Sequence, residues 1–229
     1  MEDCNLFDGE WVFDNKTHPL YKENECEFLE DWILCIRIGD GSLEIVICPR
    51  FNISNGVDEE RRGSFDEGST AYDEIELPIA YERTLKTWAN WVDNNVDPMH
   101  TSVFFTSMSP THLKSLDWDK PDGIKCAKET TPILNKTRSL EVGSNHQLFR
   151  TAVNVTRSMI VPVYFLNVTT PSEYRKDAHT SIYQAVDGKL LSPEQRFDPL
   201  KYADCVHWCL PGLPDTWNEL LYAHIITRS

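Results

Sequence analysis

The sequence predicts an α/β protein with a doubly wound parallel sheet, preceded by a small N-terminal lobe that disulfides tie together. Helical and strand-like segments alternate through residues 76–229, which is the pattern of a parallel sheet crossed by helices. Residues 1–55 instead scatter aromatic residues and cysteines at no regular period. Between these regions, residues 56–75 are rich in Gly, Ser and charge, which predicts a junction.

The first helix of the α/β region is predicted over residues 78–94, with a proline in its first turn. Tyr81, Leu85, Trp88 and Val92 follow one another at intervals of four, three and four residues, which places them on one helical face. An apolar stripe of this kind is typical of a core-facing helix. We therefore expect these side chains to pack in the core and not around a cofactor.

The later elements repeat the order of helix and strand. The apolar run 103–105 predicts a buried strand, and residues 145–158 predict a second helix. A second buried strand is expected over 161–168 and a final amphipathic helix over 215–226. In such a sheet, active residues lie in loops at the carboxyl ends of the strands.

Length and charge exclude several classes of function. The chain has 229 residues, enough for one substantial domain, and a formal net charge of -14. Binding to a nucleic acid backbone needs clustered Lys and Arg, which this sequence lacks. No apolar run approaches the roughly 20 residues that span a bilayer. If the protein is secretory, we expect its targeting segment and membrane anchor to belong to a longer native chain.

Cysteines and glycosylation acceptors both favour an oxidising lumen. Seven cysteines lack the close paired spacings of a zinc site, so disulfides are the better interpretation, and the odd count leaves one thiol over. Sequons of the Asn-x-Ser/Thr type matter only in the secretory route. They begin at Asn15, Asn52, Asn135, Asn154 and Asn167.

Five blocks of sequence are long and distinctive. They are CNLFDGEWVFDN (4–15), HPLYKENEC (18–26), FFTSMSPTH (104–112), SEYRKDAHTSIY (172–183) and YADCVHWCLPGLPDTWNELL (202–221). In this order they resemble the plant trichome birefringence-like family of polysaccharide O-acetyltransferases. The resemblance covers most of the chain outside residues 36–75.

The resemblance implies an SGNH-hydrolase-like enzyme of the Golgi lumen, a type II membrane protein when full length. It implies acetylation of hydroxyls on cell-wall polysaccharide, most often xylan, with an acetyl donor as co-substrate and no bound cofactor or metal. The family works through a Ser-His-Asp triad, whose last two members correspond to Asp204 and His207 in the Asp-x-x-His motif. A serine hydroxyl needs a histidine to take its proton and an aspartate to orient that histidine. We expect the two residues to face each other across one turn.

The chain departs from the family where the nucleophilic serine should be. The family's Gly-Asp-Ser strand-turn-helix should lie between Asn52 and Gly63, which only ten residues separate. One βαβ unit takes about 30 residues. The segment is therefore absent, and the predicted sheet is incomplete. Ser42 in Gly39-Asp40-Gly41-Ser42 lies in the N-terminal lobe and is interpreted as part of a turn.

The resemblance also implies a disulfide pattern. Three pairs are implied, namely Cys4–Cys48, Cys35–Cys209 and Cys126–Cys205. Cys26 would pair with a cysteine of the missing segment, which accounts for the odd count.

Other polar residues leave alternatives open. Arg175, Lys176 and His179 could line a polysaccharide groove or form surface salt bridges, whereas Ser109 and His112 could approach the site or stabilise a loop. Trp208 and Trp217 are expected to pack and not to serve as a sugar platform. The other histidines show no metal spacing, so no metal site is assigned: His18, His100, His146 and His224.

Two functions follow as hypotheses. The first is an O-acetyltransferase-family protein acting on xylan-type polysaccharide, inactive or weak in this shortened chain. The second is a non-catalytic polysaccharide-binding or accessory protein that keeps part of the groove. The transcript between Phe51 and Gly63 discriminates between them, because a native message that encodes the serine segment removes the basis of the second hypothesis.

Overall fold

The structure is a computed structural model that describes residues 60–63, 73–134, 141–186, 189–210 and 212–227. It divides into two compact units. One contains residues 34–107 and 145–166, and the other contains residues 1–33, 108–144 and 167–229. The predicted N-terminal lobe lies outside the described residues, so its boundary stays a prediction.

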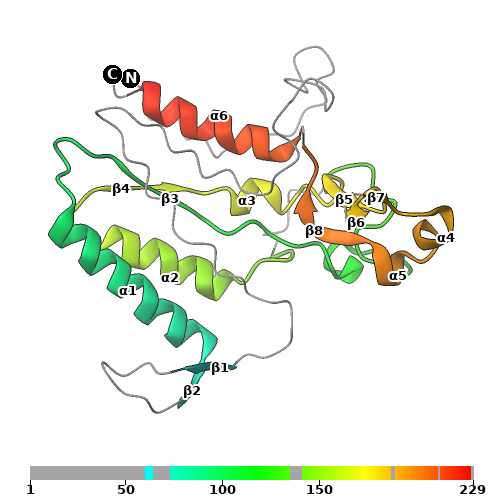
Figure 1. Cartoon of the computed structure of the whole chain (residues 1–229), viewed down its shortest axis with the longest axis horizontal. Coiled ribbons are helices and arrows are strands. Elements are labelled where there is room, and N and C mark those ends of the chain that lie inside the picture. Colours follow the sequence, from blue (N-terminus) through cyan, green and yellow to red (C-terminus); the bar gives the residue numbers. More distant parts are fainter. Residues whose placement is uncertain (1–59, 64–72, 135–140, 187–188, 211, 228–229) are drawn as a thin grey trace. The chain divides into compact units, whose positions relative to one another are not determined.

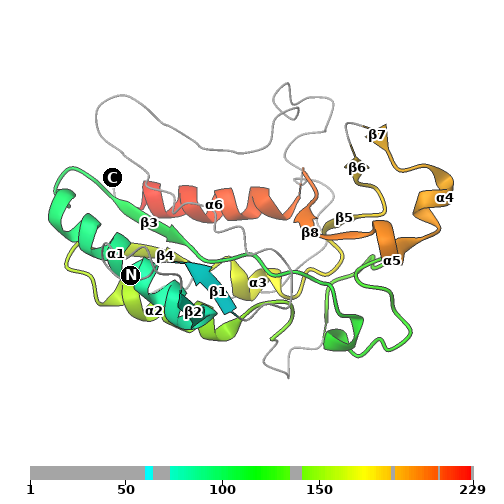
Figure 2. The same ribbon diagram turned by 60° about the horizontal axis from the view of Figure 1, so that its bottom comes forward.

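The first unit places two helices against a parallel strand pair (Figure 1). Helix α1 (Leu77–Asn95) packs beside α2 (His146–Arg157), and β3 (Val103–Thr106) pairs in parallel with β4 (Val163–Leu166). Figure 2 shows the same helices side by side after rotation. This confirms both predicted helices and the parallel pairing, on a sheet of two strands within the described residues.

The predicted stripe of α1 forms the core of this unit. Leu85 and Val92 are fully buried, and the ring centroid of Trp88 lies 5.6 Å from that of Phe105 on β3, with the two rings tilted by 57°. Ala152 and Val155 of α2 complete the same cluster. Burial of these apolar side chains supplies the main stabilisation of the helix pair on the strands.

Strand β4 is shorter than predicted because its surroundings limit the ladder. Its register with the four residues of β3 ends at the pair Thr106 and Leu166. Before the strand, the amide of Val161 donates to Oδ1 of Asp93 on α1 instead of joining a ladder (2.9 Å). The apolar run is therefore part strand and part capped turn.

A short antiparallel pair precedes α1, where the sequence indicated a linker. Strand β1 (Glu60–Gly63) pairs with β2 (Asp73–Glu76). A backbone ladder needs no apolar side chains, so charged residues can form it. These two short strands lie at the region 56–75, whose assignment as a junction stays a prediction.

The second unit is built from short elements and one long helix. Its helices are η2 (Ser115–Trp118), α3 (Thr169–Ser172), α4 (Pro193–Arg196), α5 (Pro199–Tyr202) and α6 (Leu213–Ile226). Its strands are β5 (His179–Ser181), β6 (Ala185–Val186), β7 (Lys189–Leu190) and β8 (Asp204–Trp208). The strands form two antiparallel pairs, β5 with β8 and β6 with β7.

Helix α6 begins two residues before its predicted start. Pro214 occupies the first turn, and the buried Asp215 accepts a hydrogen bond from the amide of Gly212 (2.7 Å). A side-chain acceptor at this position satisfies one of the free amide groups of the first turn. Within the described residues, no helix is both long and apolar enough to cross a membrane.

Candidate active site

The side chains of Asp204 and His207 meet on strand β8. Nδ1 of His207 lies 2.6 Å from Oδ2 of Asp204. The other carboxylate oxygen, Oδ1, accepts hydrogen bonds from the amides of Val206 (2.9 Å) and His207 (3.0 Å). The structure therefore brings together the two residues that the sequence singled out as an acid–base pair.

A register shift in the β5–β8 ladder allows this contact. His179 is opposite Trp208 and Ser181 is opposite Asp204, so β5 advances by two positions where β8 advances by four. Residues i and i+3 of a regular strand point to opposite faces. The extra residues bulge out of the ladder, which frees their amides for the Asp204 carboxylate. The motif thus lies on a bulged strand, and not on the turn that we expected.

The environment keeps Asp204 ionised. Burial raises the pKa of its carboxyl, but hydrogen bonds from the amides of His207 and Val206 and from the His207 ring outweigh burial and hold the pKa below its ordinary value. The Asp204 side chain is 15% exposed and that of His207 is 41% exposed. A charged, largely covered carboxylate thus faces an imidazole that is partly exposed.

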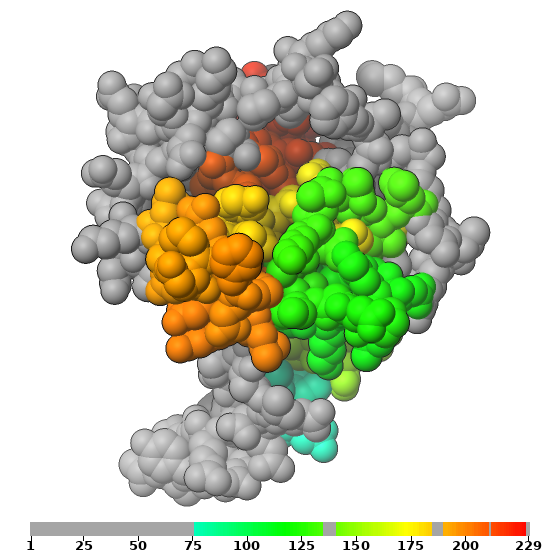
Figure 3. Space-filling model, turned by 90° about the vertical axis from the view of Figure 1, so that its right-hand side faces the viewer, coloured from blue at the N-terminus to red at the C-terminus, as the bar shows by residue number. Residues whose placement is uncertain are grey.

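A disulfide anchors β8 beside the pair. Cys126 and Cys205 are bonded across a sequence separation of 79, which confirms the pairing that the family resemblance implied. The amide of His112 donates to the carbonyl of Cys205 (3.0 Å), and Nζ of Lys125 donates to the carbonyl of Ala203 (3.3 Å). The segment that carries Cys126 and His112 lies beside the helices that precede β8. Figure 3 shows them next to each other on one face, residues 108–134 in green and the region of α4 and α5 in orange.

Two buried histidines lie behind His207. Nδ1 of His112 is 2.7 Å from Nε2 of His179, and Nδ1 of His179 is 3.1 Å from the main-chain oxygen of His207. Nε2 of His112 donates to the carbonyl of Glu173 (2.9 Å). Burial lowers the pKa of His112 to about 4 and that of His179 to about 3.

These contacts decide between the alternatives for His112. Its side chain is fully buried and ties the loop after β3 to the β5–β8 pair, so it approaches the site and stabilises a loop at once. His179 is 4% exposed, so its ring belongs to the interior of this unit. Ser109 is exposed.

The two tryptophans of the motif pack against this interior. The ring of Trp208 stacks on His179 at 3.9 Å, and Trp217 meets Trp208 edge to face at 5.7 Å. Nε1 of Trp217 donates to the hydroxyl of the buried Ser172 (2.9 Å). Such packing fixes the far side of β8.

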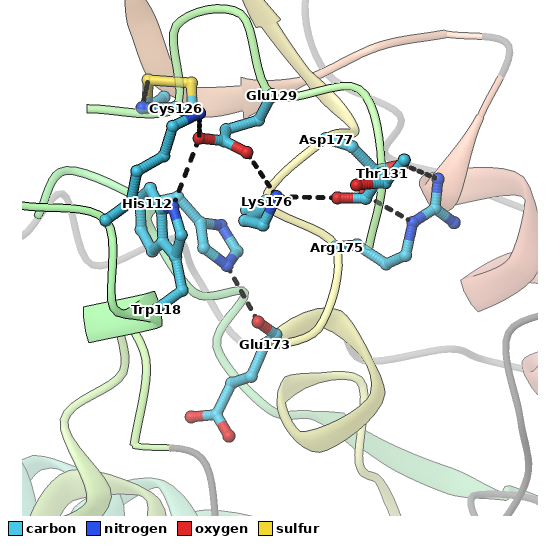
Figure 4. Close-up of polar contacts among 11 residues, drawn as sticks. His112, Trp118, Cys126, Glu129, Thr131, Glu173, Arg175, Lys176 and Asp177 are labelled. Carbon is cyan, nitrogen blue, oxygen red and sulfur yellow. Dashed lines mark hydrogen bonds and ion pairs between the residues drawn. A yellow bond between two sulfur atoms is a disulfide. The ribbon is translucent and has the colours of Figure 1, made fainter. Parts of the chain in front are cut away.

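A buried ion-pair cluster was missed by the sequence analysis (Figure 4). The carboxylate of Glu129 is 6% exposed and contacts Nζ of both Lys176 and Lys120. Nζ of Lys176 also donates to the carbonyl of Thr131 (2.9 Å). Burial raises the pKa of Glu129, but the two lysines outweigh it and leave the pKa below its ordinary value. Lys176 thus makes a buried salt bridge.

Arg175 forms its own ion pair. Its Nε lies 3.0 Å from Oδ1 of Asp177 and its Nη2 lies 3.2 Å from Oδ2. The guanidinium therefore donates two hydrogen bonds to the carboxylate in a bidentate pair. The pair is partly exposed. A groove function of Arg175 stays a prediction.

The remaining candidates fall into two groups. Four predicted cysteines, Ser42 and three sequons lie outside the described residues: Cys4, Cys26, Cys35, Cys48, Asn15, Asn52 and Asn135. Of the other sequons, Asn154 is exposed on α2 and Asn167 is half-buried. Among the described residues, no group of three or more His, Cys, Asp or Glu side chains could hold a metal ion.

Comparison with known families gives two matches. Residues 49–224 match the family described as PC-Esterase, a GDSL/SGNH-like acyl-esterase family found in Pmr5 and Cas1p. Residues 2–43 match the PMR5 N terminal Domain. Together the two matches cover the α/β region and most of the predicted N-terminal lobe.

Curated plant proteins are similar over most of the chain. Xylan O-acetyltransferase 6 of Oryza sativa subsp. japonica is 56% identical over 165 residues, which are 72% of this chain and 30% of that protein. Protein trichome birefringence-like 3 of Arabidopsis thaliana is 53% identical over 163 residues, which are 71% of this chain and 37% of that protein. The chain thus spans about a third of the length of these two relatives.

A third relative aligns almost end to end. Xylan O-acetyltransferase 2 of Oryza sativa subsp. japonica is 51% identical over 351 residues, covering 99% of this chain and 70% of that protein. The alignment is much longer than the 229 residues of this chain. A long stretch of that relative therefore has no counterpart here.

Proposed function

Because the chain belongs to the PC-Esterase family of GDSL/SGNH-like acyl esterases, we propose that it is an O-acetyltransferase-family protein of plant cell-wall polysaccharide. Xylan is the substrate to test first. The observation that carries the proposal is the hydrogen bond between Asp204 and His207, whose side chain is 41% exposed. The names of the relatives agree with this substrate class.

In this proposal Asp204 and His207 are two members of a Ser-His-Asp triad. His207 takes the proton of a serine hydroxyl through Nε2, while Asp204 holds Nδ1–H and stabilises the imidazolium that forms. The acetyl group passes from its donor to the serine and then to a sugar hydroxyl. Each transfer passes through a tetrahedral oxyanion that amide donors stabilise. The acetyl donor is a co-substrate, and no bound cofactor or metal is needed.

The chain as it stands lacks the serine segment, so we propose that it is inactive or weak. Only ten residues separate Asn52 from Gly63, and the long alignment with Xylan O-acetyltransferase 2 supports a large internal deletion. Loss of the nucleophile from a triad costs orders of magnitude in rate. The sheet of the complete family fold would contain further strands from that segment.

Activity assays on two matched proteins test the proposal. Incubated with an acetyl donor and xylo-oligosaccharide, this chain should transfer no acetyl above background. A chain in which the corresponding segment of Xylan O-acetyltransferase 2 is inserted between Asn52 and Gly63 should transfer acetyl, and His207→Ala should abolish that transfer. His100→Ala serves as control, because His100 is exposed and lies on another unit. Transfer by the present chain that survives His207→Ala would refute the assigned roles.

A second function is favoured by the loss of the serine segment alongside an intact Asp204–His207 pair. In this alternative the chain binds polysaccharide without turning it over, as an accessory protein. Saturable binding of xylo-oligosaccharide by the present chain, measured by calorimetry, would support it. Absence of binding by a chain that shows a cooperative thermal transition would remove it.

The setting that we propose is the Golgi lumen, with a membrane anchor in a longer native chain. The Cys126–Cys205 disulfide supports an oxidising compartment. We also propose three regions: a Cys-rich lobe at 1–55, a junction at 56–75 and the C-terminal part of the catalytic lobe at 76–229. Glycan mapping at Asn154 tests the secretory route, because this acceptor is exposed on α2.

A further inference from the structure

His112 and His179 form a continuous row of four ring nitrogens between two main-chain carbonyls. The row begins at the carbonyl of Glu173, passes through both rings, and ends at the carbonyl of His207. Its three contacts measure 2.9, 2.7 and 3.1 Å. Each distance is within hydrogen-bond range.

The number of protons in this row is fixed by its chemistry. A carbonyl oxygen only accepts, so each end contact needs a proton on the facing nitrogen, and the central contact between two nitrogens needs one more. Three contacts therefore need three protons. Two neutral imidazoles carry only two, so all three hydrogen bonds exist only when the pair has gained one proton.

The contact that lacks its proton in the neutral pair can be identified from geometry. Without a proton, the central contact would oppose two lone pairs at 2.7 Å between rings that are 0% and 4% exposed, where water cannot separate them. The contact of His179 with His207 is the longest, and the His207 side chain is 41% exposed. The hydrogen bond between His179 and His207 is therefore the contact that can lengthen at the lowest cost in free energy. The neutral pair should therefore keep its protons on Nε2 of His112 and Nε2 of His179.

We propose that His112 and His179 are a proton-dependent latch on the main chain of His207. The pair takes up one proton in all from solvent, and this proton lies on Nδ1 of His179, where it donates to the carbonyl of His207. One N–H bond forms as one O–H bond of a hydronium ion breaks, and the pair gains one positive charge. The two histidines are positioning residues, since they act through His207.

Charged groups on the surrounding segments both favour and oppose the binding of this proton. The carboxylates of Asp177 and Asp204 favour a positive charge on the pair, whereas Lys176 and His207 oppose it. The ring face of Trp208, 3.9 Å from His179, favours a cation as well. Because burial outweighs these carboxylates and lowers the pKa of both histidines, the latch should close on acidification, below pH 6.5.

Closure would fix His207 at a third point. Asp204 holds its ring and amide, and the latch holds its carbonyl. The inference rests on the proposed function only where it treats His207 as a catalytic base. The experiments below measure proton positions and not activity, so the latch and the proposed function can fail separately.

Nitrogen-15 NMR of the full chain, with labelled histidines, locates the protons directly. At neutral pH we expect N–H protons on Nε2 of both His112 and His179, with coupling across the central hydrogen bond and a bare Nδ1 on His179. On acidification both rings should respond in a single step that adds one proton, and the His207 and Trp208 signals should shift with the same midpoint. A proton on Nδ1 of His179 at neutral pH, or uptake of two protons, would overturn the latch.

A variant tests the same proton arrangement by a measurement at neutral pH alone. In His112→Phe the partner of Nε2 is lost, so the single proton of His179 should move to Nδ1 and donate to His207. His100→Gln, at an exposed histidine, should leave the His179 signals unchanged. If His112→Phe folds and His179 keeps its proton on Nε2, the proposal is wrong. If the variant does not fold, the wild-type nitrogen assignment at neutral pH decides.

Discussion

The carboxylate of Asp204 holds His207 at two points, through the ring Nδ1 at 2.6 Å from Oδ2 and through the amide at 3.0 Å from Oδ1. One side chain therefore sets both the orientation of the imidazole and the path of the strand that carries it. A carboxylate beside Nδ1 also selects the tautomer with the proton on that nitrogen. Nε2 is then the nitrogen that can act as a base.

Replacement of Asp204 by Asn should change that tautomer and weaken the bulge. An amide can donate to Nδ1, so the His207 proton should move to Nε2, which nitrogen-15 NMR detects. We expect the free energy of unfolding at pH 7 to fall by about 1–3 kcal/mol, because a charge-assisted hydrogen bond is lost. Asp122→Asn, at an exposed aspartate, is the matched control.

The stability difference should depend on pH with a defined sign. The pKa of Asp204 is lowered in the folded chain, so its contribution is present above the unfolded pKa and is lost as pH falls through the folded pKa. Urea unfolding should therefore show a gap between wild type and Asp204→Asn that is full at pH 7 and shrinks below about pH 4. A gap that stays constant down to pH 2 would contradict the assigned hydrogen bonds.

The disulfide between Cys126 and Cys205 should hold the candidate site as well as the unit. Replacing both cysteines by Ala should lower the free energy of unfolding by about 2–5 kcal/mol, because the bond closes a long loop. Hydrogen exchange at the amides of Val206 and His207 should also accelerate, because their strand loses its anchor. If stability falls but these amides exchange as in wild type, the disulfide does not order the site.

Replacement of the two lysines that contact Glu129 should lower the free energy of unfolding by different amounts. Lys176→Met leaves a carboxylate that is 6% exposed with one partner fewer, and should cost about 3–5 kcal/mol in urea unfolding at pH 7. Lys120 has a side chain that is 47% exposed, so Lys120→Met should cost less than about 1 kcal/mol. Adding Glu129→Gln to Lys176→Met should recover part of the loss. Equal costs for the two lysines would refute the buried character of the pair.

This cluster should also be sensitive to acid. The pKa of Glu129 is lowered in the folded chain, so the ion pairs stabilise above the unfolded pKa and are lost as pH falls through the folded pKa. The penalty of Lys176→Met should accordingly shrink below about pH 4. A penalty that grows in acid would reverse the assignment.

Local pattern was enough to predict the helices and the parallel strands. The stripe of Leu85, Trp88 and Val92 indicates a core-facing helix by its spacing alone, and the structure buries Leu85 and Val92 and half-buries Trp88. The Cys126–Cys205 bond was predicted from the family resemblance, because spacing alone cannot select partners among seven cysteines. The incomplete sheet stays a prediction.

Contacts between distant residues were out of reach of the sequence. His112 and His179 are 67 residues apart, and Glu129 and Lys176 are 47 apart, so no local period links them. The bulge of β8 depends on its pairing with β5, which the Asp-x-x-His motif does not encode. A buried salt bridge and a buried histidine pair both arise only once the chain is folded.

Gly143 provides a last test, at a crossing of two loops in the unit that holds the candidate site. Its φ of 67° is left-handed, and a Cβ atom there would lie 1.4 Å from the carbonyl oxygen of Thr111. The amide of Thr111 donates to the carbonyl of Gly143 (2.9 Å), and His112 follows directly, so the two backbones cannot separate without moving that histidine. Gly143→Ala should therefore lower the free energy of unfolding by at least about 2 kcal/mol and perturb the His112 NMR signals. Ser144→Ala should do neither, because among the described residues the Ser144 hydroxyl has no hydrogen-bond partner. A Gly143→Ala chain with unchanged stability would show that this loop crossing does not support the histidine pair.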